Sequence, residues 1–297
     1  MKFNDFLKNR YRSEVNNVKD IRTNKKSNHW LKSNTIDSWR HQRMYGCLDP
    51  ILDIYKGNSW LTIGDGRYGT DAHYLLQKGA QVTASNIDDT LLKKANKLGF
   101  IQKFRKENAE RLSFKGNSFD FVLCKESLHH FPRPYIGLYE MLRVARKGMV
   151  LIEPNDVSHN LTLLQKLFCL IKTGIKRILG IKEPSPYEPV GNYLFRISRE
   201  EMEKIALALD LPMIISRGIN DIYLENGEFQ KAHSSLPHTI LKIKIHLLDL
   251  LCYFGLLKPN ILFVAILKKS VSENDKQVFK KKGYSIHSLT RNPYLKR

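Results

Sequence analysis

One stretch decides the fold of this chain: Trp60-Leu61-Thr62-Ile63-Gly64-Asp65-Gly66-Arg67-Tyr68-Gly69. A short apolar run leads into a turn in which Gly64, Gly66 and Gly69 carry no side chain. Residues 70–76, which follow, have the composition of the first turns of a helix. Backbone N–H groups at a helix start can face a ligand closely only where no Cβ blocks the approach. The stretch therefore predicts a strand, a glycine turn and a helix that together cradle a cofactor.

Apolar and amphipathic segments alternate around this turn. A helical pattern at 37–55, interrupted at Pro50, precedes it. Gly79 and Gly99 then mark the ends of two helices. The expected strands are 59–63, 81–87, 119–124 and 148–152, and the expected helices between them are 70–78, 90–98 and 136–144. Such alternation predicts an α/β fold with a doubly wound parallel sheet and right-handed crossovers. Ligands of these sheets bind beyond the carboxyl ends of the strands.

Beyond Pro154 the alternation gives way to longer helices. Residues 160–181 have the period of one amphipathic helix, and its polar side bears only basic charges: Lys166, Lys172, Lys176 and Arg177. We interpret this helix as a lid whose apolar side covers a pocket. A helix that lies on an anionic membrane surface is the alternative interpretation.

Two further strands, 212–216 and 261–268, are expected in the last third of the chain. The helix before them begins at Ser198, which forms a capping box with Glu201 three residues later. An insertion separates the two strands and contains a second apolar helix, 240–257. This helix is expected in the core or at a dimer interface, and the sequence leaves the oligomeric state open.

The net charge of +20 is concentrated at the two ends. Residues 1–45 hold 11 lysines and arginines against 4 acids, and residues 268–297 hold 9 against 2. We expect a basic N-terminal extension (1–45), a core domain (46–268, with insertions at about 155–197 and 219–259) and a basic tail (269–297). Basic ends suit lipid headgroups, nucleic acids or phosphorylated glycans, and solvated tails explain them equally well.

Cysteine usage and hydropathy bear on the compartment. The four cysteines form no C-x-x-C pair, which disfavours a metal site or a disulfide framework and suits a reducing environment. The first residues lack the apolar run of a secretory signal, and no stretch approaches the roughly 18 apolar residues of a membrane span. A cytoplasmic protein is expected, with peripheral membrane contact through 160–181 left open.

Four segments, in the correct order, resemble class I S-adenosylmethionine-dependent methyltransferases, and specifically the type 11 branch that contains ubiquinone-type small-molecule enzymes. They are the glycine turn, Ser85-Asn86-Ile87-Asp88, Glu107-Asn108-Ala109-Glu110-Arg111-Leu112-Ser113-Phe114, and the strand at 119–122 that runs into Ser127-Leu128-His129-His130-Phe131. The resemblance covers about residues 58–153, with a weaker trace to Lys268. It implies a Rossmann-like seven-stranded sheet whose last strand is antiparallel, with helical lid insertions, and S-adenosyl-L-methionine as the cofactor.

The resemblance also implies which residues contact the cofactor. The glycine turn would approach its methionine part, Asn86 stands where the family usually has an acid for the ribose hydroxyls, and the Asn108 amide would pair with the adenine edge. The expected cofactor-binding residues are Gly64, Asp65, Gly66, Gly69, Asn86, Asp88, Asn108, Ala109, Glu110 and Lys125, and no metal ligand is expected. Asp65 could equally be a turn residue or helix cap, and Asp88 could equally cap the helix that begins at Thr90.

His129 and His130 follow the strand at 119–124, at the point where a substrate pocket should open. A histidine with a pKa near 6.5 can take a proton from an attacking oxygen or nitrogen, so either residue is a candidate catalytic base. Methyl transfer is an in-line displacement, and orientation alone can supply much of the rate. The other interpretation is that one histidine packs against residues 131–134 and orders the loop.

The sequence therefore predicts a methyltransferase that acts on a small-molecule or glycan-like acceptor, with surface polysaccharide synthesis as a looser extension. Two alternatives stay open. One is an NAD(P)-dependent oxidoreductase that binds a dinucleotide at the same turn, and the other is a catalytically inactive basic binding or adapter protein. Nucleic acid is the less favoured partner because neither basic end interleaves aromatic residues with its charges.

Overall fold

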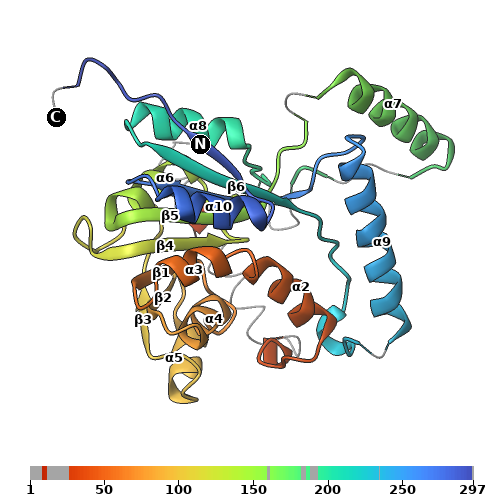
Figure 1. Ribbon diagram of the computed structural model, residues 1–297. Helices are drawn as coiled ribbons and strands as arrows, with labels where there is room; N and C mark the ends of the chain where they lie inside the picture. The colour runs from red at the N-terminus through yellow and green to blue at the C-terminus, as the bar shows by residue number, and fades with distance from the viewer. Residues whose placement is uncertain are drawn as a thin grey trace.

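The computed structural model describes residues 9–11, 27–158, 161–181, 185–187, 193–233 and 235–295. Within these ranges eight strands form one sheet in the order β3-β2-β1-β4-β5-β7-β6-β8 (Figure 1). Strands β1 to β5 pair in parallel, whereas β7 runs antiparallel to both β5 and β6. The strands are β1 (Ser59–Ile63), β2 (Gln81–Asn86), β3 (Lys103–Lys106), β4 (Phe119–Lys125), β5 (Ala145–Pro154), β6 (Met213–Ile219), β7 (Ile261–Leu267) and β8 (Ser285–Ser288). The doubly wound sheet with an antiparallel seventh strand is confirmed.

The two edge strands lie outside the segments that the alternation pattern located. β3 is a four-residue, mostly charged strand, and β8 falls within residues 269–297, which were expected to be a tail. β8 pairs antiparallel with β6, so the sheet has eight strands rather than seven. Edge strands are commonly short and polar, and such strands lack the apolar run by which central strands are recognised.

Helices cover both faces of the sheet. Alternate strand residues point to opposite faces: Trp60 and Phe121 stack in one core, with ring centroids 4.7 Å apart, whereas Leu61 and Val122 belong to the other. The first core packs against α2 (Ile36–Tyr45), α3 (Asp49–Ile54), α4 (Thr70–Gln77), α5 (Thr90–Lys97) and α10 (Glu273–Lys281). The second packs against α6 (Pro134–Val144) and α8 (Arg199–Ala208).

Helix α2 belongs to the folded body, although its residues were assigned to a basic extension. Ile36 and Met44 are fully buried, and Thr35 caps the helix by accepting the Ser38 N–H. The expected helix at 37–55 is two helices, because the chain turns at residues 46–48 and Pro50 lies in the first turn of α3. Proline is tolerated at that position because it has no N–H to leave unpaired.

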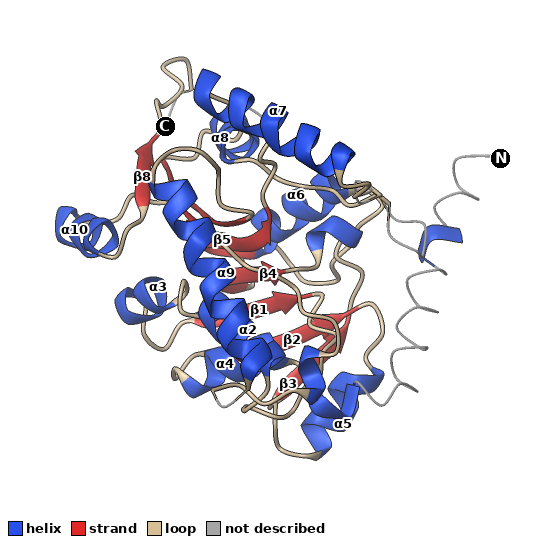
Figure 2. Ribbon diagram, turned by 90° about the vertical axis from the view of Figure 1, so that its right-hand side faces the viewer, coloured by secondary structure: helices blue, strands red, loops and turns tan. Residues whose placement is uncertain are grey.

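Helices α7 (Leu163–Ile178) and α9 (Leu236–Tyr253) stand apart from both layers, on the same side of the molecule (Figure 1, Figure 2). They correspond to the helices expected at 160–181 and 240–257, although residues 159 and 160 lie outside the described residues. α9 packs on α2 through Leu241 and Ile245. In the described part of the chain, no helix has both the length and the apolar character needed to cross a membrane.

The glycine turn joins β1 to α4. Gly64 and Gly69 have φ angles of +73° and +71°, in the left-handed region that favours glycine. A Cβ on Gly64 would lie 1.7 Å from Ser127 Oγ, so the segment after β4 passes directly against the turn. Gly69 is the N-cap residue of α4. The turn therefore fixes the relative positions of β1, α4 and the residues that follow β4.

Replacing Gly64 by alanine is expected to cost more stability than the matched replacement of Gly57, whose φ is +71° but whose surroundings are open. Both variants meet the positive-φ penalty of about 1–2 kcal/mol, and Gly64→Ala adds a steric overlap of about 1–3 kcal/mol. Urea unfolding measures both losses. Equal destabilisation by the two substitutions would show that the Gly64–Ser127 approach does not constrain the turn.

Candidate active site

A cavity of about 920 Å³ opens beyond the carboxyl ends of β1, β2 and β4, where the sheet topology predicts a ligand site. It is lined by the glycine turn, the end of β2, residues 107–110 and the segment after β4. Side chains from α2 also line it, together with residues from other parts of the chain such as Trp30, Leu194 and Tyr223. The volume is in the range of small-molecule and cofactor sites.

The cavity brings together ten of the twelve candidate residues: Gly64, Asp65, Gly66, Asn86, Asn108, Ala109, Glu110, Lys125, His129 and His130. Gly69 and Asp88 do not line it. Gly69 packs beside Ile101, whose Cγ2 would be 2.9 Å from a Cβ, and its role is to begin α4. Asp88 Oδ1 accepts the Thr90 N–H at 2.9 Å, so its side chain bonds at the start of α5, although the N-cap residue of that helix is Asp89.

Asp65 holds the turn to α4. Its carboxylate accepts hydrogen bonds from the N–H groups of Asp71 (3.2 Å) and Ala72 (2.9 Å) and from the Thr62 hydroxyl (2.9 Å). Burial, together with the neighbouring Asp71 carboxylate, raises the pKa of Asp65 to about 7. Its oxygens are thus engaged within the turn, which is the helix-cap role that the sequence left open.

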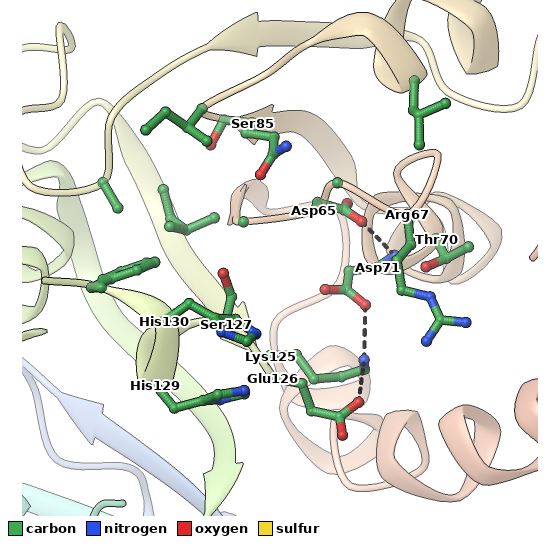
Figure 3. Close-up of a pocket in the computed structure, with 18 of the residues that line it drawn as sticks. Asp65, Arg67, Thr70, Asp71, Ser85, Lys125, Glu126, Ser127, His129 and His130 are labelled. Atoms are coloured by element: carbon green, nitrogen blue, oxygen red, sulfur yellow. Dashed lines mark hydrogen bonds and ion pairs between the residues drawn. The ribbon is translucent and has the colours of Figure 1, made fainter. Parts of the chain in front are cut away.

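Lys125 lies at the centre of a buried polar cluster (Figure 3). Its Nζ is 3.3 Å from Asp71 Oδ1 and 2.8 Å from His41 Nδ1, and the Tyr45 hydroxyl donates to the same Asp71 oxygen at 2.7 Å. Burial would lower the pKa of Lys125, but the Asp71 and Glu126 carboxylates more than offset this and raise it. The ammonium is therefore occupied by protein groups from α2 and α4, rather than directed at a cofactor.

The polar cluster extends across α2. The His41 ring lies between Lys125 and Arg67, with Arg67 Nη1 2.6 Å from Nε2, and burial plus these two cations lower its pKa. Arg67 also pairs with Asp37 and stacks over the Trp30 ring at 4.6 Å. Sequence reasoning missed Trp30, Asp37 and His41 because they belong to the presumed extension and match no motif, and it gave Arg67 no role although the residue lies in the glycine turn.

A second ion pair ties α2 to the far end of the sheet. Arg40 Nε donates to Asp221 Oδ1 at 3.1 Å, and both side chains are buried. Asp221 follows β6, and its N–H donates to Asn260 Oδ1 at 2.9 Å just before β7. The α2 wall of the cavity is therefore attached to the strands that lie 180 residues further along the chain.

The opposite wall offers amide groups. Asn86 Nδ2 donates to the Asp88 carbonyl at 2.8 Å, which leaves Oδ1 as the acceptor this side chain can offer to a ligand. Asn108 Oδ1 accepts the Glu110 N–H at 2.9 Å, which leaves its NH₂ group as the donor. With these local bonds in place, Asn86 can still offer an acceptor and Asn108 can still offer a donor, as expected.

Glu110 lines the cavity, but its carboxylate is engaged by the protein. It accepts the Tyr11 hydroxyl at 2.5 Å, the Arg133 N–H at 2.7 Å and Arg133 Nε at 2.6 Å. Burial and the Glu110 carboxylate raise the pKa of Tyr11, so the phenol keeps its proton. Glu110 therefore anchors Tyr11 and Arg133 at the rim, and the geometry does not support a direct cofactor contact by its oxygens.

His129 is oriented by a buried carboxylate that the sequence did not identify. His129 Nδ1 lies 2.7 Å from Glu153 Oε2, while Glu153 Oε1 accepts the N–H groups of Ser127 and Leu128, each at 2.8 Å. Because a carboxylate only accepts, Nδ1 carries a proton, and the neutral form of this imidazole therefore has its lone pair on Nε2. The sequence did contain one signal for this role: Glu153 is an acid that directly follows the expected strand at 148–152.

His130 lies beside this pair, with its ring centroid 4.0 Å from that of His129 (Figure 3). Both histidines line the cavity, and Nδ1 of His129 lies 2.7 Å from the Glu153 carboxylate. Among the residues that the structure describes, no group of three or more histidine, cysteine or acidic side chains could hold a metal ion. The contact with Glu153 fixes the orientation of the His129 imidazole at the edge of the cavity.

Comparisons with known proteins match the segment that builds this site. Residues 61–152 match the family described as Methyltransferase domain. The chain is 30% identical over 120 residues to 2-methyl-6-phytyl-1,4-hydroquinone methyltransferase of Synechocystis sp., an alignment that covers 39% of this chain and 37% of that protein. It thus spans just over a third of the length of this curated relative.

A solved structure extends the likeness in fold. The crystal structure of YcgJ protein from Bacillus subtilis superposes with a TM-score of 0.50 and 16% identity, covering 78% of this chain and 100% of that one. The shared fold reaches well beyond residues 61–152. It agrees with the Rossmann-like sheet implied by the sequence resemblance.

The polar cluster is expected to make the free energy of unfolding depend on pH in the acid range. Burial alone would raise the pKa of Glu126, but Lys125, His41 and Arg40 lower it from 4.5 to about 2. A depressed carboxyl pKa contributes stability above the unfolded value, and this contribution is lost as pH falls from about 4.5 towards 2. Glu126→Gln should therefore lower the free energy of unfolding at pH 7 by about 1–3 kcal/mol.

Chemical unfolding of wild type and Glu126→Gln at pH 7 and near pH 3 tests this expectation. The gap between the two proteins should shrink at the lower pH, because below about pH 4.5 the unfolded chain binds a proton at Glu126 that the folded protein does not, which favours unfolding of the wild type only. A gap of the same size at both pH values would mean that the Glu126 charge does not contribute to stability. Glu225→Gln provides a control on an acid whose side chain is outside the cluster.

Proposed function

We propose that this protein transfers a methyl group from S-adenosylmethionine to the hydroxyl group of a small-molecule acceptor, because residues 61–152 match the family described as Methyltransferase domain. The observation that carries the proposal is that the glycine turn and His129, which Glu153 orients from behind, line one cavity. The turn offers a place for the cofactor, and the pair offers a base beside it.

The residues present suit an adenosyl cofactor. A Cβ on Gly66 would lie 2.8 Å from Asn86 Nδ2, so the absence of a side chain keeps the turn and the end of β2 open to a ligand. Asn86 Oδ1 would accept a ribose hydroxyl, and the Asn108 NH₂ group would donate to the adenine edge. When bound, S-adenosylmethionine supplies a methyl group on a positively charged sulfur.

The chain's own contribution is positioning and a proton acceptor. Glu153 holds the Nδ1–H of His129, so the Nε2 lone pair is the site that accepts the proton of an acceptor hydroxyl. The imidazolium that results is stabilised by the same carboxylate. The buried position of Glu153 strengthens this interaction, because little water competes for its oxygens.

Aromatic and apolar residues also line the cavity, among them Trp30, Phe131, Leu194 and Tyr223. Such walls suit a ring-shaped acceptor, and both a phenol ring and the apolar face of a sugar pack against aromatic side chains. The curated relative is named for a hydroquinone. Hydroquinones and hydroxyl-bearing glycans are therefore the two acceptor classes to test, and surface polysaccharide synthesis would require the second.

Calorimetry with purified protein tests the cofactor half of the proposal. S-adenosylmethionine and its demethylated product should bind, and NADH should not. Gly66→Val should weaken binding of both at least about tenfold, because the added methyl groups meet Asn86, while Gly57→Ala should leave it unchanged. Binding of NADH in preference to S-adenosylmethionine would favour an oxidoreductase, and binding of neither would support a non-catalytic role.

Transfer of a labelled methyl group to a panel of hydroquinones and glycans tests the catalytic half. His129→Gln should lower kcat by about 10²–10⁴-fold with cofactor binding intact, and His130→Gln should have a much smaller effect. Glu153→Gln keeps an oxygen that can accept the Ser127 and Leu128 N–H groups but removes the negative charge beside His129. Its lower rate should therefore come with an altered pH profile. Equal rates in His129→Gln and wild type would eliminate His129 as the base.

A further inference from the structure

Helix α7 presents an unusually apolar surface to solvent. Its leucines and isoleucines are between 52% exposed (Leu164) and 86% exposed (Ile178), and of its sixteen residues only Gln165 is buried. The exposed apolar residues are Leu163, Leu164, Leu167, Leu170, Ile171, Ile175 and Ile178. No α7 residue lines the cavity, so the expected lid over the pocket is not the arrangement found.

Helix α9 is apolar along two stripes. One stripe, formed by His238, Leu241 and Ile245, is buried against the body, where Ile36 is its neighbour. The second points outward with a spacing of three and four residues, which keeps it on one face of the helix. Its members are Leu236, Ile240, Ile243, Leu247 and Leu250, and the exposed Tyr253 and Phe254 continue it at the C-terminal end.

The exposed faces of α7 and α9 lie on the same side of the molecule. Chain segments next to both helices contribute residues to the cavity. Figure 2, which turns this side towards the reader, shows α9 crossing in front of the sheet and α7 above it. Leu194 lies in the segment between α7 and α8, and Tyr223 lies between β6 and α9. Both residues line the cavity, so the segments next to α7 and α9 in the chain form part of its wall.

The charges on this surface have one dominant sign. α7 has four basic residues, Lys166, Lys172, Lys176 and Arg177, and no acid. α9 adds the exposed Lys242 and Lys244, and Asp249, the one acid in that helix, accepts a hydrogen bond from Asn220 at 2.8 Å. Apolar residues flanked by lysine and arginine are the composition of helices that lie at a membrane interface.

We propose that the outward faces of α7 and α9 form a docking surface for an anionic lipid bilayer. The apolar side chains would enter the boundary between headgroups and acyl chains, and the basic residues would contact phosphate groups. A second copy of the chain, or closure of α7 onto α9, would cover the same apolar area but would bring basic helices together. Charge complementarity thus favours the lipid surface, whichever methyl acceptor the enzyme uses.

Flotation of the full-length protein with vesicles tests this proposal without any cofactor or acceptor. Binding to vesicles of mixed phosphatidylcholine and phosphatidylglycerol should exceed binding to pure phosphatidylcholine by about tenfold, and added salt should reduce it. Two charge-reversal variants separate local from overall charge. Lys166→Glu with Lys172→Glu should reduce binding, whereas Lys94→Glu with Lys97→Glu on α5, which changes the net charge equally, should not.

Apolar substitutions test the inserted faces. Leu167→Asp with Ile171→Asp on α7, and Ile243→Asp with Leu247→Asp on α9, should each lower vesicle binding at least about fivefold. Leu98→Asp, at a position that is 67% exposed beside α5, is the matched control and should leave binding unchanged. These positions are exposed, so thermal unfolding should show folded variants.

Three outcomes would overturn the proposal. They are no binding to anionic vesicles, equal binding to neutral and anionic vesicles, and binding that the α7 and α9 substitutions leave unchanged. Light scattering in solution would then identify the alternative occupant, because a dimer that the same substitutions dissociate assigns these faces to a second copy of the chain. Since vesicle binding is measured without cofactor, failure here leaves the proposed methyl transfer intact.

Discussion

The buried ammonium of Lys125 is the constraint on which the site depends. A charge taken out of water must be matched by partners with good geometry, and removing one partner of such a cluster is strongly destabilising. Its partners come from two helices: His41 lies on α2, and Asp71 lies on α4, where its carboxylate also accepts the hydroxyl of Tyr45 from α2. Pairing this one charge therefore holds α2 in place as a wall of the cavity.

The same rule gives His129 its chemical character. The Glu153 carboxylate is fully buried at the end of β5 and needs donors for both oxygens. Two backbone N–H groups satisfy one oxygen, and the imidazole N–H of His129 satisfies the other. An arrangement that the fold needs for electrostatic reasons thus also presents an imidazole lone pair to the cavity, beside the turn that suits an adenosyl group.

How far the site could be predicted from the sequence depended on the range of the interactions. The glycine turn, the central strands and the positions of Gly66, Asn86 and His129 follow from local patterns, so the residues themselves contain the signal. The pairing of Arg40 with Asp221 joins residues 181 positions apart, and no local pattern announces it. Asp65 illustrates the intermediate case: its place was predictable, but whether its oxygens bind a ligand or cap α4 required coordinates.

Helix α2 has consequences for how this protein can evolve. Its ten residues satisfy three neighbours at once: Met44 packs in the core, Asp37, Arg40 and His41 form the cavity wall, and Ile36 lies under α9. A substitution that suits one neighbour has to be tolerated by the other two. This short segment, basic and unremarkable in composition, should therefore drift more slowly among relatives than the long exposed helices around it.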